Sequence, residues 1–243
     1  MKIVTLIKIL KKILIDKDEW SRFFLAETMF NLIYKKMKVQ EFGNIMFEDK
    51  EFLEYYDKFS DANNHSFDRK YTLNNLTNLV TNLEGEIAEC GVFMGATSYL
   101  IANKFTIETI YLFDTFEGLS KPNTDIDGSY WKEGDLTANI DSVKSNLKQF
   151  SNIVYMKGFI PGRFKEVKDT KFKFVHIDVD LYGPTKDSLE FFYSNMVAGG
   201  IIICDDYGFT SCPGAKKAFD DFFVDKLENI IQLSSGQAFI IKQ

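Results

Sequence analysis

Two apolar, β-branched runs that end in acidic residues stand out in the second half of the chain. They cover residues 173–182 and 200–207, and their pattern is typical of strands that are buried on both faces. In an open α/β sheet, ligands bind just beyond the carboxyl ends of the parallel strands. Because unpaired buried charge is costly, the acids at these two ends predict a metal site or an acid/base site. The acids are Asp178, Asp180, Asp205 and Asp206.

Strands and helices alternate along the chain after residue 84. Besides the two strands that carry Asp178 and Asp205, we expect strands at about 85–92, 109–114 and 153–157, and two strands joined by a tight turn within 230–241. Helices are expected at about 95–105, 138–150, 184–196 and 214–227. Such alternation implies right-handed crossovers between parallel strands. It therefore predicts a doubly wound, Rossmann-like α/β sheet with an antiparallel strand at one edge.

Helical spacing prevails before that point. We expect a helical cap or oligomerisation region over residues 1–80, followed by one α/β domain over 81–243. Residues 1–15 predict an amphipathic helix, with Lys8 and Lys12 opposite its apolar face. This helix would pack on the body of the protein or on a second subunit of a homo-oligomer; the alternative is a basic helix on a membrane surface. No apolar run approaches the ~20 residues that a membrane span requires.

Composition narrows the classes of protein that fit. Apolar residues make up 45% of the 243 residues, which is typical of a globular protein. The formal net charge of −6 argues against nucleic acid as the main partner, because phosphate binding calls for a basic surface. Cys90, Cys204 and Cys212 form no CxxC pair, so neither a disulfide framework nor a zinc knuckle is expected. We infer a reducing compartment and expect a cytoplasmic protein.

The turn between the first strand and the first helix of the α/β region has the spacing of a nucleoside site. Glu89, Gly91 and Gly95 form the pattern E-x-G-x-x-x-G, and the second strand ends in Asp114, which is suited to bind ribose hydroxyls. The dinucleotide fingerprint has a third glycine, and a carboxylate at Glu89 would repel a diphosphate. A cofactor with a cationic amino-acid portion fits better, which favours S-adenosylmethionine over NAD. The alternative is an ordinary turn that needs two glycines.

The acids beyond the fourth and fifth strands form the second candidate site. Neighbouring strands lie ~4.8 Å apart, so Asp178 and Asp205 would share one end of the sheet. Together with Asp206 they suit a hard cation, Mg²⁺ first, with Ca²⁺ or Mn²⁺ as alternatives. The competing interpretation is that these acids cap helices or pair with Lys and Arg. His176 lies within the strand, and we expect a hydrogen-bonded core histidine rather than a ligand.

Five motifs together resemble the macrocin O-methyltransferase family, the class I S-adenosylmethionine-dependent enzymes that methylate sugar hydroxyls of macrolides and related glycosides. The likeness covers about 84–243, whereas residues 1–80 match only loosely, as a helical cap. Residues 158–164 depart from the family, which has a Thr-Leu-Pro-like turn nearby. The motifs are residues 88–92, 113–119, 176–182 with Pro184-Thr185, 199–207, and 212–218.

The resemblance implies a seven-stranded sheet and a metal-dependent transfer of a methyl group to a hydroxyl of a sugar or glycosylated small molecule. It implies Mg²⁺ held by Asp178, Asp205 and Asp206, with Asp180 as general base, although Asp178 stays a candidate for that role. Glu89, Gly91 and Asp114 would hold S-adenosylmethionine, with Gly95 closing the same turn. These roles are expectations that follow from the family.

Three other functions stay open at this point. The chain could methylate a catechol-like or other non-sugar acceptor, or act as a nucleotide-dependent oxidoreductase, although the missing third glycine weighs against the latter. It could also be a non-catalytic nucleoside-binding module. The polar loop 117–137 carries Tyr130 and Trp131, and we expect either a lid that contacts the acceptor or a disordered surface loop.

Overall fold

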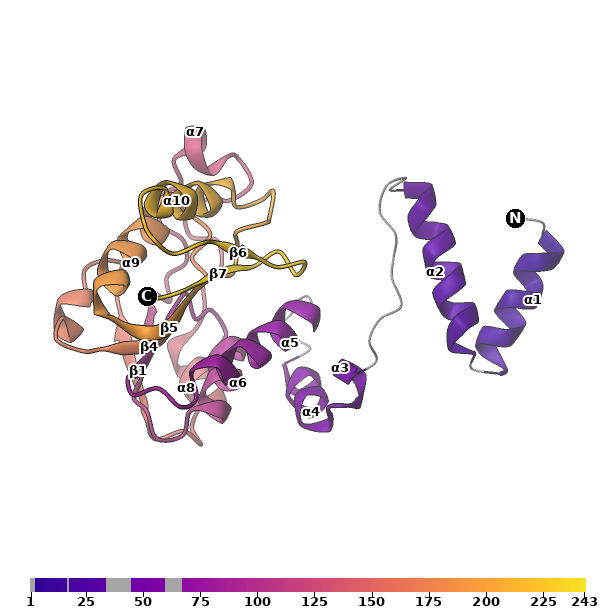
Figure 1. The fold of residues 1–243 in the computed structure, drawn as a ribbon, viewed down its shortest axis with the longest axis horizontal. Coiled ribbons are helices and arrows are strands. Elements are labelled where there is room, and N and C mark those ends of the chain that lie inside the picture. Colours follow the sequence, from indigo (N-terminus) through magenta and orange to yellow (C-terminus); the bar gives the residue numbers. More distant parts are fainter. Residues whose placement is uncertain (1–2, 17, 34–44, 60–66) are drawn as a thin grey trace. The chain divides into compact units, whose positions relative to one another are not determined.

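The computed structural model describes residues 3–16, 18–33, 45–59 and 67–243, which belong to two compact units, Met1–Lys50 and Glu51–Gln243 (Figure 1). In the first unit, α1 and α2 contact each other. Large apolar side chains of these two helices are exposed, among them Leu14 and Trp20. The predicted roles of this region in oligomerisation or membrane contact stay predictions. The helices of this unit are α1 (Ile3–Leu14), α2 (Glu19–Ile33) and α3 (Ile45–Glu48).

The second unit begins with helices whose buried side chains join the hydrophobic core on one face of its sheet. They are α4 (Lys50–Lys58), α5 (Phe67–Leu76) and the 3-10 helix η2 (Thr77–Val80). The predicted helical region 1–80 is therefore divided between the two units, and the predicted domain boundary at residue 80 stays a prediction. None of the described helices combines the length and apolar character that a membrane crossing needs.

A seven-stranded sheet in the order β3-β2-β1-β4-β5-β7-β6 forms the centre of this unit. The first five strands of this order are parallel, whereas β7 pairs antiparallel with both β5 and β6. This arrangement confirms the doubly wound α/β fold and the antiparallel strand near one edge. The strands are β1 (Glu86–Cys90), β2 (Ile110–Asp114), β3 (Ile153–Lys157), β4 (Phe172–Ile177), β5 (Met196–Cys204), β6 (Ile231–Gln232) and β7 (Ala238–Ile241).

Helices cover both faces of the sheet because successive strand residues point to opposite sides. Ile87 of β1 packs into a core with α4, α5, α6 (Ala96–Lys104) and α8 (Ile140–Asn146). Its neighbour Ala88 packs into a second core with the 3-10 helix η3 (Phe164–Val167), α9 (Tyr182–Asn195) and α10 (Pro213–Phe223). The strand ends that carry the acids therefore lie between two layers of helices.

The loop 117–137 contains a helix that the sequence did not predict, α7 (Thr124–Asp127). The side chain of Asn123 caps it by accepting a hydrogen bond of 3.1 Å from the backbone N–H of Asp125. Asp127 is buried and accepts a hydrogen bond of 2.7 Å from the backbone N–H of Tyr182 at the start of α9. These contacts tie the loop to the core, so the expectation of a disordered surface loop is wrong for this segment.

Glu228 links the end of the chain to α9. Its carboxylate accepts hydrogen bonds from Lys242 Nζ (2.9 Å), the Tyr193 hydroxyl (2.8 Å) and the backbone N–H of Gln243 (3.2 Å). Burial alone would raise the pKa of Glu228, but these hydrogen bonds outweigh burial and lower the pKa to about 2. The stabilisation is therefore complete above the ordinary pKa of 4.5 and is lost as the pH falls towards 2.

We expect Glu228→Gln to lower the free energy of unfolding by about 1–3 kcal/mol at pH 7, because it weakens hydrogen bonds that involve charged groups. The difference from the parent protein should shrink at pH 3. Urea unfolding of both proteins at the two pH values measures this. Glu190→Gln, which removes an exposed helical ion pair with Lys186, is the control and should change little. An equal deficit at both pH values would contradict the assignment.

Candidate active site

The turn from β1 into α6 lies against the segment that follows β4. Gly91 adopts a φ of +86°, and a Cβ atom added there would overlap the backbone oxygen of Asp178. The backbone N–H of Asp178 donates a hydrogen bond of 2.8 Å to the carbonyl of Cys90. Gly95, with a φ of +82°, is the residue before α6. Glycine at position 91 therefore allows the turn after β1 to lie directly against an acidic strand end.

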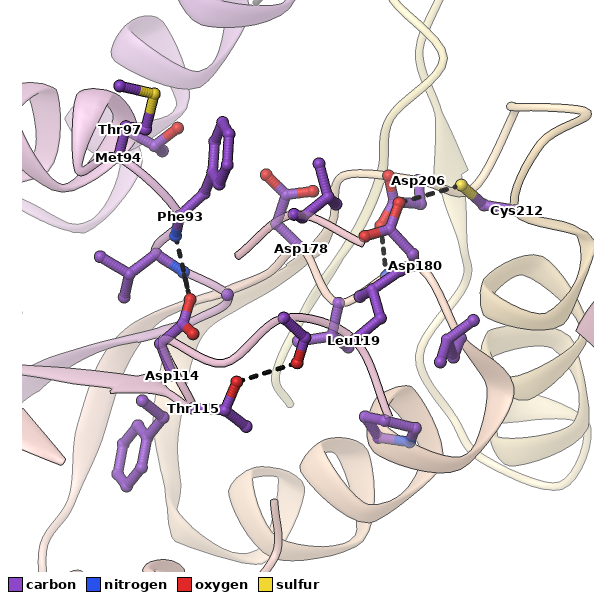
Figure 2. A pocket seen from close by; sticks show the side chains of 18 of the residues that line it. Phe93, Met94, Thr97, Asp114, Thr115, Leu119, Asp178, Asp180, Asp206 and Cys212 are labelled. Atoms are coloured by element: carbon purple, nitrogen blue, oxygen red, sulfur yellow. Dashed lines mark hydrogen bonds between the residues drawn. The ribbon is translucent and has the colours of Figure 1, made fainter. Parts of the chain in front are cut away.

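Asp114 at the end of β2 holds this turn in place (Figure 2). Its Oδ2 atom accepts hydrogen bonds from the backbone N–H groups of Val92 (2.7 Å) and Phe93 (2.9 Å). Its Oδ1 atom accepts a third, of 2.6 Å, from the backbone N–H of Phe116. A carboxylate offers about four acceptor positions, so capacity for one more donor is left. Asp114 can thus position the turn and still accept a hydrogen bond from a ligand hydroxyl.

A cavity of about 480 Å³ opens between the turn and the acids. This volume falls within the roughly 300–1,000 Å³ that small-molecule sites occupy. Aromatic side chains from α4 and from the loops form part of its wall, including Tyr55, Phe59, Trp131, Phe159 and Phe209. Five of the predicted site residues line it as well: Gly91, Asp114, Asp178, Asp180 and Asp206.

Glu89, Gly95 and Asp205 do not line this cavity but lie directly behind its wall. Glu89 has no exposed surface; it accepts a hydrogen bond from the Ser98 hydroxyl, and its Oε1 atom lies 3.3 Å from His176 Nδ1. Gly95 packs against α8 and its end, where a Cβ atom would meet Val143 at 3.1 Å. In this structure these residues support the cavity, and a direct contact between Glu89 and a cofactor stays a prediction.

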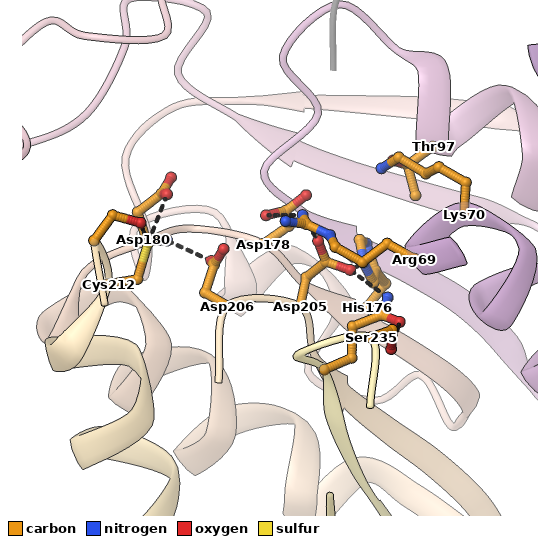
Figure 3. Close-up of polar contacts among 12 residues, drawn as sticks. Arg69, Lys70, Thr97, His176, Asp178, Asp180, Asp205, Asp206, Cys212 and Ser235 are labelled. Atoms are coloured by element: carbon orange, nitrogen blue, oxygen red, sulfur yellow. Dashed lines mark hydrogen bonds and ion pairs between the residues drawn. The ribbon is translucent and has the colours of Figure 1, made fainter. Parts of the chain in front are cut away.

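The acids and their neighbours form two sets of close donor atoms among the described residues (Figure 3). One set is His176, Asp178 and Asp205; the other is Asp180, Asp206 and Cys212. Within each set, the potential ligand atoms lie within 4.8 Å of one another. The structure thus divides the predicted metal ligands, because Asp206 belongs to the second set.

Asp205 and His176 form a buried hydrogen-bonded pair. Asp205 Oδ1 lies 3.1 Å from His176 Nε2 and accepts a hydrogen bond of 2.6 Å from Gln237 Nε2. His176 is completely buried between Glu89 and Asp205, which confirms the prediction of a hydrogen-bonded core histidine. The two ring nitrogens of His176 each have an acidic neighbour. Because His176 and Gln237 both contact Asp205 Oδ1, these residues behind the cavity wall fix the orientation of Asp205.

Arg69 of α5 lies between the carboxylates of the first set. Its guanidinium forms an ion pair with Asp205, and its Nη2 atom is 4.0 Å from Asp178 Oδ1. The guanidinium carbon lies 4.7 Å from the centroid of the Phe209 ring. The competing interpretation from the sequence, in which an acid pairs with Arg, therefore holds for Asp205 in this structure. The positively charged guanidinium of Arg69 thus lies beside both Asp178 and Asp205.

Asp180 lies in the second set with an unusual backbone. Its φ of +60° is in the left-handed region, and its backbone N–H donates a hydrogen bond of 3.0 Å to Asp206 Oδ2. Cys212 Sγ donates to Asp180 Oδ1 at 3.3 Å. Burial, together with the nearby charge of Asp178, raises the pKa of Asp180 to about 7. Burial and the charge of Asp180 likewise raise the pKa of Asp206.

Sequence reasoning missed the contributions of α5, α6 and Cys212 to this site. Lys70 is 7% exposed, lines the cavity and donates a hydrogen bond to the Thr97 hydroxyl of α6. Burial lowers the pKa of Lys70. Trp131, which the sequence predicted to contact the acceptor as part of a lid, lines the cavity. Its indole N–H donates a hydrogen bond of 3.3 Å to Cys212 Sγ. The sequence did not reveal these roles, because two adjacent basic residues in a helix, such as Arg69 and Lys70, look the same in a sequence whether they are buried or exposed to solvent.

Comparisons with known proteins place these features in context. The family model of the macrocin-O-methyltransferase (TylF) matches residues 7–232. A protein of Streptomyces olivaceus, named 8-demethyl-8-(2,3-dimethoxy-alpha-L-rhamnosyl)-tetracenomycin-C 4'-O-methyltransferase, is 27% identical over 154 residues, which cover 57% of this chain. The demethyldecarbamoylnovobiocin O-methyltransferase of Streptomyces niveus is 27% identical over 158 residues, or 58% of this chain. Each match spans 59% of the length of the relative.

The solved structure of the O-methyltransferase NovP is similar in fold. The TM-score is 0.62 at 22% sequence identity, and the match covers 75% of this chain and 84% of NovP. This similarity supports the assignment of the α/β fold.

We expect Gly91→Ala to destabilise the protein by several kcal/mol, because a methyl group there meets a backbone atom that cannot move away. Gly134→Ala is the matched control: Gly134 has a φ of +84°, but nothing lies within 4 Å of its added Cβ. It should cost only the ~1–2 kcal/mol of the left-handed backbone. Thermal unfolding of both variants measures the difference, and equal losses would contradict the close approach of β1 and Asp178.

Proposed function

Because the chain belongs to the macrocin O-methyltransferase family, we propose that it transfers a methyl group from S-adenosylmethionine to a hydroxyl of a sugar or glycosylated small molecule, with the help of a divalent cation. The observation that carries this proposal is the shared cavity. In it, Asp178 lies between the turn held by Asp114 and the pair of Asp180 and Asp206 (Figure 2). A nucleoside cofactor and a hydroxyl acceptor can therefore meet at Asp178.

The sugar acceptor is inferred from the relatives. The Streptomyces olivaceus relative carries a rhamnosyl compound in its name, and that enzyme acts at a 4' oxygen. Aromatic rings such as Tyr55 and Trp131 line the cavity here and offer flat apolar faces to a sugar ring. Trp131 comes from the loop 117–137, which supports the proposed contact between this loop and the acceptor.

The residues present fit a divalent cation. Asp178 and Asp205 supply carboxylate oxygens, which hard cations prefer. The Arg69 guanidinium lies beside both carboxylates and provides positive charge where a metal ion would provide it. Asp206 adds a further carboxylate nearby. Burial, together with the charges of neighbouring aspartates, raises the pKa values of Asp180 and Asp206, so positive charge beside them would be favourable. A bound divalent cation supplies that charge and lowers the pKa of a neighbouring hydroxyl.

Asp180 is the proposed general base. S-adenosylmethionine supplies an already activated methyl group, so the protein chiefly has to orient the acceptor and remove its proton. Asp180 lines the cavity, and Cys212 and the left-handed backbone hold its carboxylate in place. Asp178 lies beside Arg69 and Asp205, which supports its assignment to the cation rather than to proton transfer.

The proposed function is tested by incubation with labelled S-adenosylmethionine and a panel of glycosides, sugar nucleotides and catechols, with and without EDTA. We expect label to appear on a sugar hydroxyl and to vanish with EDTA. Transfer to catechols alone would replace the sugar acceptor. Full transfer in EDTA would remove the cation from the proposal, and transfer to no hydroxyl compound, with no binding of the cofactor, would contradict it altogether.

We expect Asp180→Asn to lower kcat by ~10²–10⁴-fold, because the amide cannot accept the acceptor's proton. Binding of S-adenosylhomocysteine, measured by calorimetry, should change less than about threefold. Asp141→Asn, on the exposed first turn of α8, is the control for loss of a negative charge and should retain full turnover. Unchanged turnover in the Asp180 variant would show that another group takes the proton.

We also expect Arg69→Met to bind Mn²⁺ more tightly than the parent protein, by roughly 3–10-fold, because the cation no longer competes with the guanidinium for Asp178 and Asp205. Electron paramagnetic resonance of free Mn²⁺ measures the affinity. Arg163→Met removes an exposed arginine paired with Glu166 and should leave the affinity unchanged. Weaker binding in the Arg69 variant, with binding abolished by Asp178→Asn, would show that Arg69 supports the site.

A further inference from the structure

The thiol of Cys212 lies between the loop 117–137 and the carboxylate of Asp180. Its Sγ atom donates a hydrogen bond of 3.3 Å to Asp180 Oδ1 (Figure 2). The same sulfur atom accepts a hydrogen bond of 3.3 Å from the indole N–H of Trp131. Cys212 and Asp180 are both buried, so the contact between them lies away from open solvent. The proposed general base is therefore hydrogen-bonded to a side chain that the loop contacts in turn.

Cys212 occupies the residue before α10, but its side chain does not cap that helix. Ser, Thr, Asn and Asp are the residues that usually cap a helix at this position, because their side-chain oxygens accept hydrogen bonds from the first turn. The thiol is directed to Asp180 instead, and the hydroxyl of Ser211 lies 3.4 Å from its sulfur atom. The side chain of Cys212 thus serves the carboxylate rather than the helix.

One oxygen of the Asp180 carboxylate is left for another donor. Oδ1 accepts the hydrogen bond from Cys212, whereas Oδ2 has no hydrogen-bond donor among the described residues. Asp180 lines the cavity, and its backbone N–H is bonded to Asp206 Oδ2. A hydrogen bond to Oδ1 restricts the rotation of the carboxylate and so sets the direction of Oδ2. A general base has to lie within hydrogen-bond reach of the proton that it takes, so this direction matters for catalysis.

The loop that contributes the indole is anchored at the starts of α9 and α10. Asp127 of α7 accepts a hydrogen bond of 2.7 Å from the backbone N–H of Tyr182, the first residue of α9. Its Oδ1 atom lies so close to Gly214, in the first turn of α10, that an added Cβ atom there would overlap it. Asp180 lies two residues before α9, and Cys212 directly precedes α10. The loop, the thiol and the carboxylate are therefore held by the same two helix starts.

We propose that Cys212 and Trp131 are positioning residues for Asp180. The indole N–H orients the thiol, and the thiol orients the carboxylate that takes the proton of the acceptor hydroxyl. The inference rests on the proposed function, in which Asp180 is the general base. It gives Trp131 a second role: the flat face of the ring contacts the acceptor, whereas the N–H acts on the base through the sulfur atom. The loop 117–137 then contributes to the chemical step as well as to acceptor binding.

Two variants of Cys212 test the contact with the base. Cys212→Ala removes the donor, whereas Cys212→Ser keeps a hydroxyl donor in its place. Turnover is measured with labelled S-adenosylmethionine, Mg²⁺ and the most reactive glycoside of the panel. We expect Cys212→Ala to lower kcat by roughly 10–100-fold, because a reacting group misplaced by about 1 Å can cost that much. KM, and the affinity for S-adenosylhomocysteine in calorimetry, should change less than about threefold.

The serine variant should recover kcat to within about threefold of the parent protein, because its hydroxyl can donate to Asp180 as the thiol does. A loss in Cys212→Ser as large as in Cys212→Ala, or an effect of the alanine variant on KM alone, would overturn the inference.

A double-mutant cycle tests the contact with the loop. Trp131→Phe keeps an aromatic face for the acceptor but removes the N–H, so we expect kcat to fall by roughly 3–10-fold, with KM changed less than about threefold. In the Cys212→Ala background the same change should cost less than about twofold, because the indole acts only through the thiol. Trp20→Phe alters an exposed tryptophan of α2 and is the control without effect. Losses that multiply in the double variant would overturn the inference.

Should Cys212→Ala fail to fold, as judged by circular dichroism, Trp131→Phe and Cys212→Ser decide. A lower kcat at unchanged KM in the former, with turnover near that of the parent protein in the latter, supports the inference, and any other result overturns it. Failure of this inference differs from failure of the proposed function. Full kcat in Trp131→Phe and Cys212→Ala would overturn the inference while leaving Asp180 as the base. A parent protein that methylates no hydroxyl compound would overturn the proposed function together with the inference.

Discussion

The site depends on the close approach between the turn after β1 and the chain that leaves β4. Gly91 has no room for a side chain there, and the backbone N–H of Asp178 donates a hydrogen bond to the carbonyl of Cys90, the last residue of β1. The neighbouring strand β2 ends beside them, so Asp114 can reach the backbone N–H groups of the turn. Three parallel strands thereby bring the turn after β1 and an acidic cluster to one cavity. A bulkier residue at position 91 would push the two halves of the site apart.

Charge balance explains why α5 belongs to the site. Four carboxylates gather at the ends of β4 and β5, and three of them, Asp180, Asp205 and Asp206, are buried. Arg69 of α5 brings positive charge to the cluster, and its neighbour Lys70 lines the cavity, where burial lowers the pKa of Lys70. Behind the wall, His176 separates the buried acids Glu89 and Asp205. The polar groups of the site therefore form layers, with the ligand-facing groups oriented by partners that a ligand cannot reach.

The sequence predicted what local pattern and topology control. Apolar runs that end in aspartates gave β4 and β5, and the rule for parallel strand ends placed Asp178 and Asp205 together. The burial of Lys70 could not be predicted, because it depends on how α5 packs on α6, and an isolated helix carries no record of that contact. Glu89 illustrates a finer limit. It follows Ala88 on β1, opposite His176, and strand alternation turns its side chain into the core behind the cavity.

The backbone of Asp180 accounts for the separation of the acids into two sets. In a regular strand, residues two apart point to the same face, so Asp178 and Asp180 would compete for one position. Asp180 has a left-handed conformation; its backbone N–H donates to Asp206, and its carboxylate accepts a hydrogen bond from Cys212. Asp178 stays with Asp205 and Arg69. One strained residue thus allows two carboxylates of the same strand end to take different partners, which a division between cation binding and proton transfer requires.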